Sequence, residues 1–294
     1  MKESQGPGSL DTSQVGQYTI AKSFLLSPRK IMAYGASIKD ANNLFFDDLR
    51  KEGLVAHPFI AFSLQWNTRF TPQIPPNPKA APYNVQAATD LLIHRPFREG
   101  DLITSQGKII SMEKIRPGVK QVTRYRMTDA ENQLVAELDM IGIIRGADLS
   151  GPSVVLAQTQ DRPLQPSSSD HLWQTSVEIT ADAAQIYTEC ADIYNPIHTE
   201  RKVAIAAGLP DIILHGSATQ AISASLIADK CLKKDITKIK RYYGELRAMV
   251  LMNSSITIRC IEEREANNGR EIFFEVLNAE GEKAVANGYM LAET

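Results

Sequence analysis

The chain has 294 residues, and its 43% of apolar and 22% of charged residues are typical of a soluble globular protein with a sizeable core. Its formal net charge of -2 lacks the surplus of lysine and arginine that a general grip on nucleic acid needs, so we expect no nucleic-acid partner. No run approaches the roughly 18 to 20 apolar residues of a membrane span, and no secretory signal is evident, so we expect a cytoplasmic protein without membrane contact.

The three cysteines, Cys190, Cys231 and Cys260, stand far apart and form no C-x-x-C pair. This spacing favours neither a metal site nor a disulfide framework, and it fits a reducing compartment.

The first segment, residues 1–17, is rich in glycine, serine and glutamine and poor in large apolar side chains. Such a segment buries too little surface to offset the entropy lost on ordering. We therefore expect a flexible N-terminal arm.

Residues 18–146 are predicted to form the first folded unit. Ser27 as N-cap and Pro28 in the first turn predict a helix in SPRKIMAYGAS, and HPFIAFSLQWN predicts an apolar helix. The proline-rich run TPQIPPNPKAAPYN predicts a surface loop, since proline removes the donors that a central strand needs. Antiparallel strands are expected at 85–95, 101–113, 119–128 and 134–145.

Residues 147–170 are rich in proline, serine and glutamine, which is typical of a linker. Residues 171–294 then repeat the order of the first unit. Thr180 is the expected N-cap of a helix in TADAAQIYTECA, and HGSATQAISASLIADKC is the expected buried central helix. Strands are expected at 236–249, 254–263, 270–277 and 283–292.

The two units align with one another along the sequence. Setting Asn42 against Asn195 gives an offset of 195 − 42 = 153, and the same offset places Phe45 on His198. Because the order of elements also agrees, the sequence predicts two copies of one structural unit.

The second unit carries a motif in YTECADIYNPIHTERKVAIAAGLPDIILHGSA, residues 187–218. Asn195-Pro196-x-His198, then Gly208, then His215-Gly216 resembles the signature of MaoC-like dehydratases and (R)-specific enoyl-CoA hydratases. The resemblance implies an α+β double hotdog, in which each half has a central helix wrapped by an antiparallel sheet. The first half resembles the degenerate half of two-hotdog members, which is the acyl-chain side.

The resemblance also implies a reaction: addition of water to a trans-2-enoyl thioester to give a (3R)-hydroxyacyl thioester, or the reverse. It needs neither metal nor cofactor, and the substrate is an acyl thioester of CoA or a carrier protein, including polyketide intermediates. His198 would be the acid/base, Asn195 would orient the loop or the water, and the Gly216 N–H would bind the thioester oxygen. The expected catalytic residues are Asp192, Asn195, His198 and Gly216, and the expected substrate-binding residues are Tyr194, Pro196, His215 and Ser217.

The sequence departs from the family pattern at the carboxylate. The family places it two positions before the Asn, where this chain has Ile193, while Asp192 lies one position earlier. A one-residue step changes the direction of a side chain by about 100° in a helix and reverses it in a strand.

Three alternatives follow for the chemistry of His198. Local geometry could bring Asp192 to it and preserve hydration. His198 could instead work with another polar partner, such as Tyr194 or Glu189, in dehydration, isomerisation or another proton transfer. In the third alternative the site binds a thioester or another apolar ligand without turnover.

Other interpretations stay open for the whole chain and for its basic run. A hotdog thioesterase and a non-catalytic binding or partner protein are the alternatives to a hydro-lyase. The basic run 233–241 is either a contact for CoA phosphates or a solvated face. Two fused halves pair their own sheet edges, so a monomer would suffice, and a homodimer is the alternative.

Overall fold

The computed structural model describes residues 6–167 and 170–293. Part of the expected N-terminal arm lies in this range. There β1 (Ser9–Leu10) pairs in parallel with β7 (Asp148–Leu149), and Leu10 is buried. This leucine packs in a small core cluster with Ile144 and Val119.

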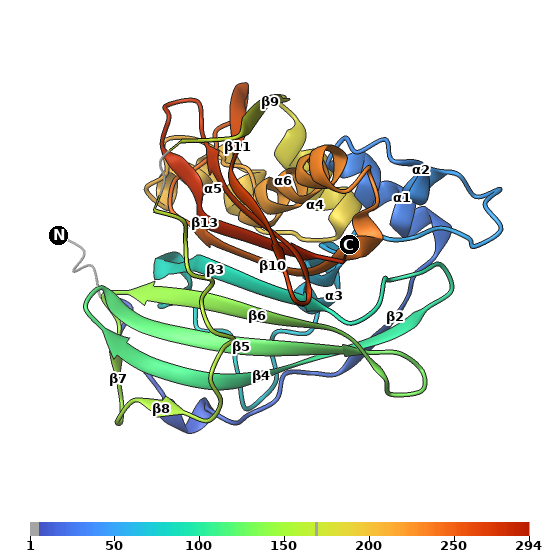
Figure 1. Ribbon diagram of the computed structural model, residues 1–294. Coiled ribbons are helices and arrows are strands. Elements are labelled where there is room, and N and C mark those ends of the chain that lie inside the picture. The colour runs from blue at the N-terminus through green and yellow to red at the C-terminus, as the bar shows by residue number, and fades with distance from the viewer. Residues whose placement is uncertain (1–5, 168–169, 294) are drawn as a thin grey trace.

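Each half contributes five antiparallel strands, in matching order, to one continuous sheet of the described residues (Figure 1). In the first half the spatial order is β2-β4-β5-β6-β3, and in the second it is β10-β13-β12-β11-β9. The strands are β2 (Lys22–Leu25), β3 (Asn84–Ile93), β4 (Leu102–Ile115), β5 (Gly118–Thr128), β6 (Leu134–Arg145), β9 (Trp173–Ile179), β10 (Ile239–Leu246), β11 (Ser254–Ala266), β12 (Gly269–Leu277) and β13 (Lys283–Ala292). The short β8 (Val154–Val155) adds to β4. The eight strands expected from sequence are confirmed, whereas β2 and β9 were not expected.

The two halves join through β3 and β10, which pair antiparallel with Tyr242 opposite Leu91. Arg241, the last residue of the basic run, binds the buried Asp90 of β3 through Nε and an Nη atom at 2.9 and 2.7 Å. A bidentate pair of this kind fixes register as well as charge. This arginine therefore belongs to the junction of the halves.

The helices lie within the curve of the sheet (Figure 1). The first half has α1 (Pro28–Ser37), α2 (Asn43–Phe46) and α3 (Ile60–Trp66), and the second has α4 (Ala183–Ala191), the 3-10 helix η3 (Pro196–His198), α5 (Arg201–Ala206) and α6 (Gly216–Cys231). The central helices α3 and α6 differ in length, 7 residues against 16. The sequence predicted the four longer helices, and it did not predict α2, η3 or α5.

Helix starts were predicted with mixed success. Ser27 caps α1 as expected, since its hydroxyl accepts from the Lys30 N–H at 3.3 Å. Thr180 was the wrong N-cap for α4, because Asp182 occupies that position and Thr180 supplies only its carbonyl to the Ala183 N–H. None of the helices in the described part of the chain combines the length and apolar character that crossing a membrane would require.

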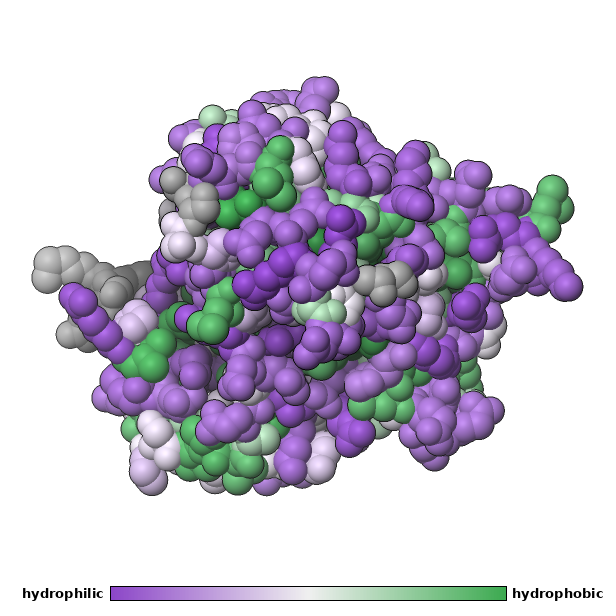
Figure 2. Space-filling model, in the orientation of Figure 1, coloured by the Kyte–Doolittle hydropathy of each residue, from purple (hydrophilic) through white to green (hydrophobic). Residues whose placement is uncertain are grey.

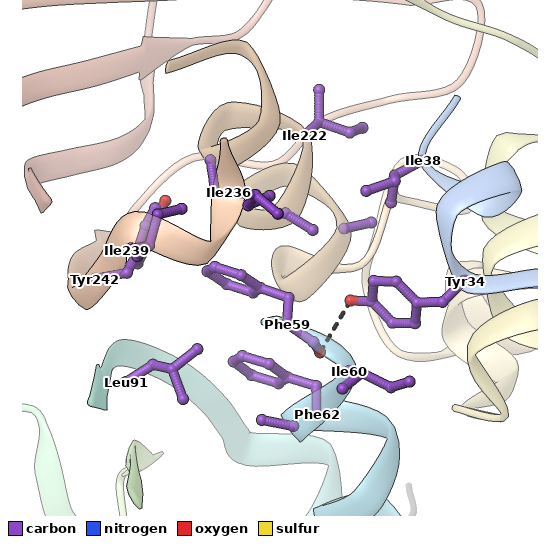
Figure 3. Packing of buried hydrophobic residues seen from close by; sticks show 14 of the residues in the cluster. Tyr34, Ile38, Phe59, Ile60, Phe62, Leu91, Ile222, Ile236, Ile239 and Tyr242 are labelled. Carbon is purple, nitrogen blue, oxygen red and sulfur yellow. Dashed lines mark hydrogen bonds between the residues drawn. The ribbon is translucent and has the colours of Figure 1, made fainter. Parts of the chain in front are cut away.

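The main core is shared by both halves, and aromatic side chains fill its centre. Figure 3 shows the rings of Phe59 and Phe62 packed between Tyr34, Leu91 and Tyr242. The Tyr34 hydroxyl donates to the Phe59 carbonyl at 3.0 Å. Hydrophilic side chains dominate the molecular face seen in Figure 2, with apolar groups in small separate patches, as expected when the large apolar side chains are used in the core.

Candidate active site

The motif loop begins where α4 ends. Asp192 ends the helix in the left-handed conformation (φ 58°), and its N–H binds the Thr188 carbonyl. Asn195 then caps η3, with its side-chain oxygen accepting from the Ile197 N–H at 3.5 Å. Asparagine at an N-cap and Pro196 at the first helical position are the residue types that such a turn prefers. The loop is therefore held in a conformation that places His198 at the end of η3.

His198 is held by a backbone carbonyl. Its Nδ1 lies 2.8 Å from the Ile213 oxygen, and a carbonyl only accepts, so Nδ1 carries the proton. Nε2 is then an acceptor, and it has no hydrogen-bond partner among the described residues. Burial lowers the pKa of His198 to about 4. The ring is neutral near pH 7 and presents one basic nitrogen.

His215 stacks on His198, with ring centroids 3.7 Å apart and planes at 26°. Its Nε2 donates to the Ile193 carbonyl at 3.2 Å and lies 3.3 Å from the Thr188 hydroxyl. Burial and the neighbouring His198 ring lower the pKa of His215 to about 2. Its Nδ1 is buried and forms no hydrogen bond within the described residues. His215 thus stays neutral and supports the flat face of His198.

Gly216 follows His215 directly and begins α6. The first N–H groups of a helix have no partner within it, and His215 supplies no side-chain cap. The Gly216 amide is therefore available to an anionic oxygen, assisted by the positive end of the helix dipole. A Cβ at this position would lie 2.4 Å from Leu246 Cδ1. Packing against Leu246 is therefore one reason for a glycine at this position.

Sequence reasoning missed a hydrogen-bonded chain behind the histidines. The Tyr187 hydroxyl donates to Ser217 Oγ at 3.1 Å and lies 3.0 Å from the Tyr34 hydroxyl, and all three residues are buried. The two tyrosines are 153 positions apart, which is the offset of the internal repeat. The repeat was the signal that could have paired them. Ser217 is thereby fixed as part of the α6 start.

The expected acid lies outside this cluster. Asp192 is exposed, and its carboxylate accepts from Asn67 Nδ2 at 3.0 Å. Ile193 instead takes the inward direction, with its side chain 4% exposed in the core. Tyr194 is also exposed and donates to Glu200. Within the described residues no carboxylate forms an ion pair or a hydrogen bond with His198.

The first half repeats this arrangement without its reactive groups. Phe45 stands for His198 and packs edge-on against His57, with ring centroids 5.8 Å apart. Pro58 follows His57, so the position of the Gly216 amide has no N–H in this half. Burial lowers the pKa of His57 to about 3. Only the second half joins a free imidazole nitrogen to a free helix N-terminus.

The described residues offer no candidate metal site. Within residues 6–167 and 170–293, no three side chains of His, Cys, Asp or Glu come together in a group that could hold a metal ion.

Comparison with known proteins identifies the half that carries this geometry. Residues 166–284 match the family described as MaoC like domain. This match places the likeness to MaoC-like domains in the second half of the chain. The enoyl-CoA hydratase ChsH3 of Mycobacterium tuberculosis is 31% identical to this chain over 85 residues, which cover 29% of this chain and 29% of that protein. The chain thus matches less than a third of that relative.

Solved structures extend the likeness of the MaoC-like half to the whole fold. A MaoC-like dehydratase from Phytophthora capsici superposes with a TM-score of 0.81 at 18% identity, over 96% of this chain and 97% of that one. The Mycobacterium tuberculosis protein Rv0216, described as a double hotdog fold, superposes with a TM-score of 0.58 at 13% identity, over 94% and 95%. The chain therefore has an α+β double hotdog fold, as the resemblance implied.

Proposed function

We propose that this protein is a hydro-lyase that interconverts 2-enoyl and 3-hydroxyacyl thioesters. The matches of residues 166–284 to the MaoC-like family and of the chain to an enoyl-CoA hydratase support acyl-thioester hydration or dehydration in general. The substrate would be a thioester of CoA or of a carrier protein, with a trans-2-enoyl and (3R)-hydroxyacyl pair as the specific form.

One observation carries the proposal. The His198 ring stacks on the residue that directly precedes the Gly216 amide, so a free basic nitrogen and a free helix N-terminus lie side by side. The carbonyl of a thioester at Gly216 would hold C2 and C3 of the acyl chain near His198. A positioned base is worth roughly 10² to 10⁴ in rate, and an oxyanion donor roughly 10² to 10³.

The reaction balances with one imidazole. In dehydration, Nε2 of His198 removes the C2 proton, and the electrons pass to the thioester oxygen, which accepts from the Gly216 N–H. The C3–O bond then breaks, the imidazolium returns its proton to the departing hydroxyl, and water leaves with a C2–C3 double bond formed. Hydration runs the same steps in reverse.

Without a carboxylate that points toward His198 among the described residues, this histidine has to carry out both proton transfers. A second carboxylate would help hold and deprotonate water, whereas Asp192 is engaged with Asn67 and Ile193 faces the core. An imidazolium with a pKa of about 4 is a strong acid for a histidine. The same low pKa makes the neutral ring a weaker base toward the C2 proton, so it favours neither hydration nor dehydration. Asn195, Pro196 and Ser217 position the loop and the helix start.

The test is turnover of both members of the substrate pair. The enoyl thioester absorbance should appear from 3-hydroxybutyryl-CoA, more from the (3R) than from the (3S) form, and should fall when crotonyl-CoA is supplied. Longer acyl chains and carrier-bound thioesters form the second series. Release of free thiol would instead identify a thioesterase. Absence of any change across CoA and carrier thioesters would reject the hydro-lyase.

Binding without turnover is the second candidate, and the outward position of Asp192 favours it. Isothermal titration with a saturated acyl-CoA separates this candidate from an inactive preparation. Binding combined with no turnover of any enoyl or hydroxyacyl thioester would establish it.

A further inference from the structure

A cleft of about 810 Å³ lies between the loop of the first half that corresponds to the motif loop and α6 of the second half. One wall is the loop of residues 38–44, which the offset of 153 aligns with residues 191–197 of the motif loop. The opposite wall is the second half of α6 and the segment 233–237 that follows it. Ligand pockets commonly enclose roughly 300 to 1,000 Å³, so this cleft is large enough for one.

The cleft is separate from the His198 site. Its contact with α6 begins at Ile222, six residues after Gly216, or about 9 Å along a helix. The residues that line the cleft do not include His198, His215 or Gly216. The cleft is the counterpart of the candidate active site in the internal repeat. It lacks a base because Phe45 replaces the reactive histidine.

The floor of the cleft is apolar. Figure 3 shows Ile38 of the first half and Ile222 of the second facing one another beyond Phe59. Val55 and Leu226 continue this floor. Such a surface fits an alkyl or acyl chain, since burying its methylene groups removes them from water.

The rim carries cations without carboxylate partners. Within the described residues none of the lining cations forms an ion pair, whereas Lys240 and Arg241 of the same basic run bind Glu293 and Asp90. The lining cations are Lys39, Arg50, Arg98, Lys233 and Lys234. The Arg50 Nε is buried and has no hydrogen-bond acceptor among the described residues. A ligand with acceptor oxygens would supply one.

The acidic residues of the rim are partly engaged elsewhere. Asp40 accepts from the Asn42 N–H at 3.0 Å, and Asp235 accepts from the Thr237 N–H at 3.1 Å. Burial, with a contribution from Asp40, raises the pKa of Asp229. With Glu52, four carboxylates line the cleft against five cations, and Lys39 donates to Thr180 at 3.3 Å. The net charge of the lining is therefore positive by one, which favours an anionic ligand at Lys233 and Lys234.

Two adjacent lysines of the rim are held in a costly backbone conformation. Lys233 and Lys234 both have positive φ angles, 52° and 66°, which non-glycine residues seldom adopt in succession. Asn42 of the other half fixes this turn, since its Nδ2 donates to the Lys234 carbonyl at 2.7 Å. Strain of this kind collects at ligand sites because the surrounding structure maintains it there.

Ser225 adds one polar group to the floor. His57 accepts the Phe59 N–H at Nδ1, so its Nε2 carries the proton and donates to Ser225 Oγ at 3.2 Å. The serine cannot be deprotonated by this ring, and it is no nucleophile. Its own hydroxyl proton is free to bind a carbonyl or amide oxygen in the cleft.

We infer that this cleft binds a second acyl phosphopantetheine thioester, which it holds without turnover. The acyl chain would lie on Ile38 and Ile222, and the phosphates would meet the rim cations at Lys233 and Lys234. The choice of ligand rests on the proposed function, because the cleft is the counterpart of a proposed thioester site. Its existence as a site rests on the floor, the rim and the strained turn.

The test is isothermal titration of the full chain with hexanoyl-CoA, a saturated thioester that cannot be hydrated. We expect two molecules per wild-type chain. Ile222→Trp, which fills the floor, should leave one. Lys233→Glu with Lys234→Glu should weaken one class of site at least about tenfold. Lys238→Glu, in the same basic run but outside the cleft, is the matched control and should keep two. Circular dichroism and melting curves check that each variant folds.

Stoichiometry also separates this inference from the proposed function. One molecule per chain, lost in Gly216→Pro and kept in Ile222→Trp, would overturn the cleft and support the His198 site. The opposite pattern would support the cleft and reject the His198 site as a thioester site. No binding at all would overturn both.

Two sources of the ligand are distinguished by parallel titrations. Hexanoyl-pantetheine lacks phosphate and should bind the cleft at least about tenfold more weakly than hexanoyl-CoA. A hexanoyl-loaded carrier protein tests whether the phosphopantetheine arrives on a protein. Equal affinity for hexanoyl-pantetheine and hexanoyl-CoA, with no effect of Lys233→Glu and Lys234→Glu, would contradict the anionic contact.

Discussion

The two halves share one architecture and differ at two positions that decide the chemistry. Where the second half has His198 and Gly216, the first has Phe45 and Pro58. Both halves keep a buried histidine before the central helix, His57 or His215, with a strongly lowered pKa. The buried histidine thus accompanies the fold, whereas the free imidazole nitrogen and the free amide occur together only in the second half.

The largest effect is expected when His198 is converted to its counterpart. His198→Phe should lower kcat by roughly 10² to 10⁴, because it removes the acid/base while keeping an aromatic ring against His215. The measurement is the rate of formation or loss of the enoyl thioester. The mirror variant Phe45→His should add no activity, since Pro58 offers no N–H. Retained turnover in His198→Phe would contradict the assignment of the second half as active and of the first half as inactive.

Two substitutions at Gly216 separate the effect of the oxyanion donor on kcat from the effect of packing against Leu246. Gly216→Pro copies the first half and removes the N–H, while Gly216→Ala keeps it, and both add the Cβ that meets Leu246. Proline fits the first helical position, and His215 already has an extended backbone (φ -59°, ψ 135°). We expect Gly216→Pro to lose a further 10² to 10³ in kcat, roughly the value of one oxyanion donor. Leu246→Ala in both backgrounds relieves the shared contact. Equal rates for the two variants would exclude the amide as donor.

Acid stability should report the buried histidines that the halves share. Their pKa values, about 3 for His57 and about 2 for His215, lie below the ordinary 6.5, so the unfolded chain binds protons that the native chain does not. Stability is then fully present above pH 6.5 and falls as the pH drops toward 4. Each histidine contributes about 1.4 kcal/mol per pH unit in that window. Urea unfolding at several pH values measures the slope, and His57→Asn should flatten it. A slope unchanged in that variant would contradict the neutral buried state.

Restoring the family carboxylate should change the pH profile. Ile193→Asp places an acid beside the stacked histidines, and an opposite charge within about 4 to 6 Å raises a histidine pKa. The acidic limb of kcat/KM, expected near pH 4 in the wild type, should move upward. Ile193→Asn is the uncharged control and should leave it in place. A limb that does not move would show that this position does not face His198.

The smallest effect is expected at Asp192. Its carboxylate is exposed and bound to Asn67, so Asp192→Ala should leave kcat within about twofold. Alanine in the left-handed conformation of this position (φ 58°) should cost about 1 to 2 kcal/mol of stability. Asn67→Ala removes the same hydrogen bond from the other side without that strain and should also leave kcat within about twofold. A loss in Asp192→Ala comparable with that of His198→Phe would mean that this carboxylate turns inward during the reaction.

The strands, the central helices and the motif were predictable because each depends on local pattern. Strand alternation and turn residues placed eight strands, and Asn195, Pro196 and His198 stood at family-like spacing. The edge strand β2 was missed because it has only four residues, whereas β9 alternates regularly between exposed and less exposed positions and could have been predicted from its pattern.

The sequence by itself determined that the chain repeats a unit, that one copy keeps an imidazole and a glycine, and that the family acid is displaced. Only the tertiary structure decided that Asp192 faces solvent, that His215 supports His198, and that a cleft lies between the first half and α6. Side-chain direction in an irregular loop depends on contacts between distant residues, such as Asn67 with Asp192 and Asn42 with Lys234. Local pattern fixes the elements, whereas the packing of one half on the other fixes where each side chain of the site points.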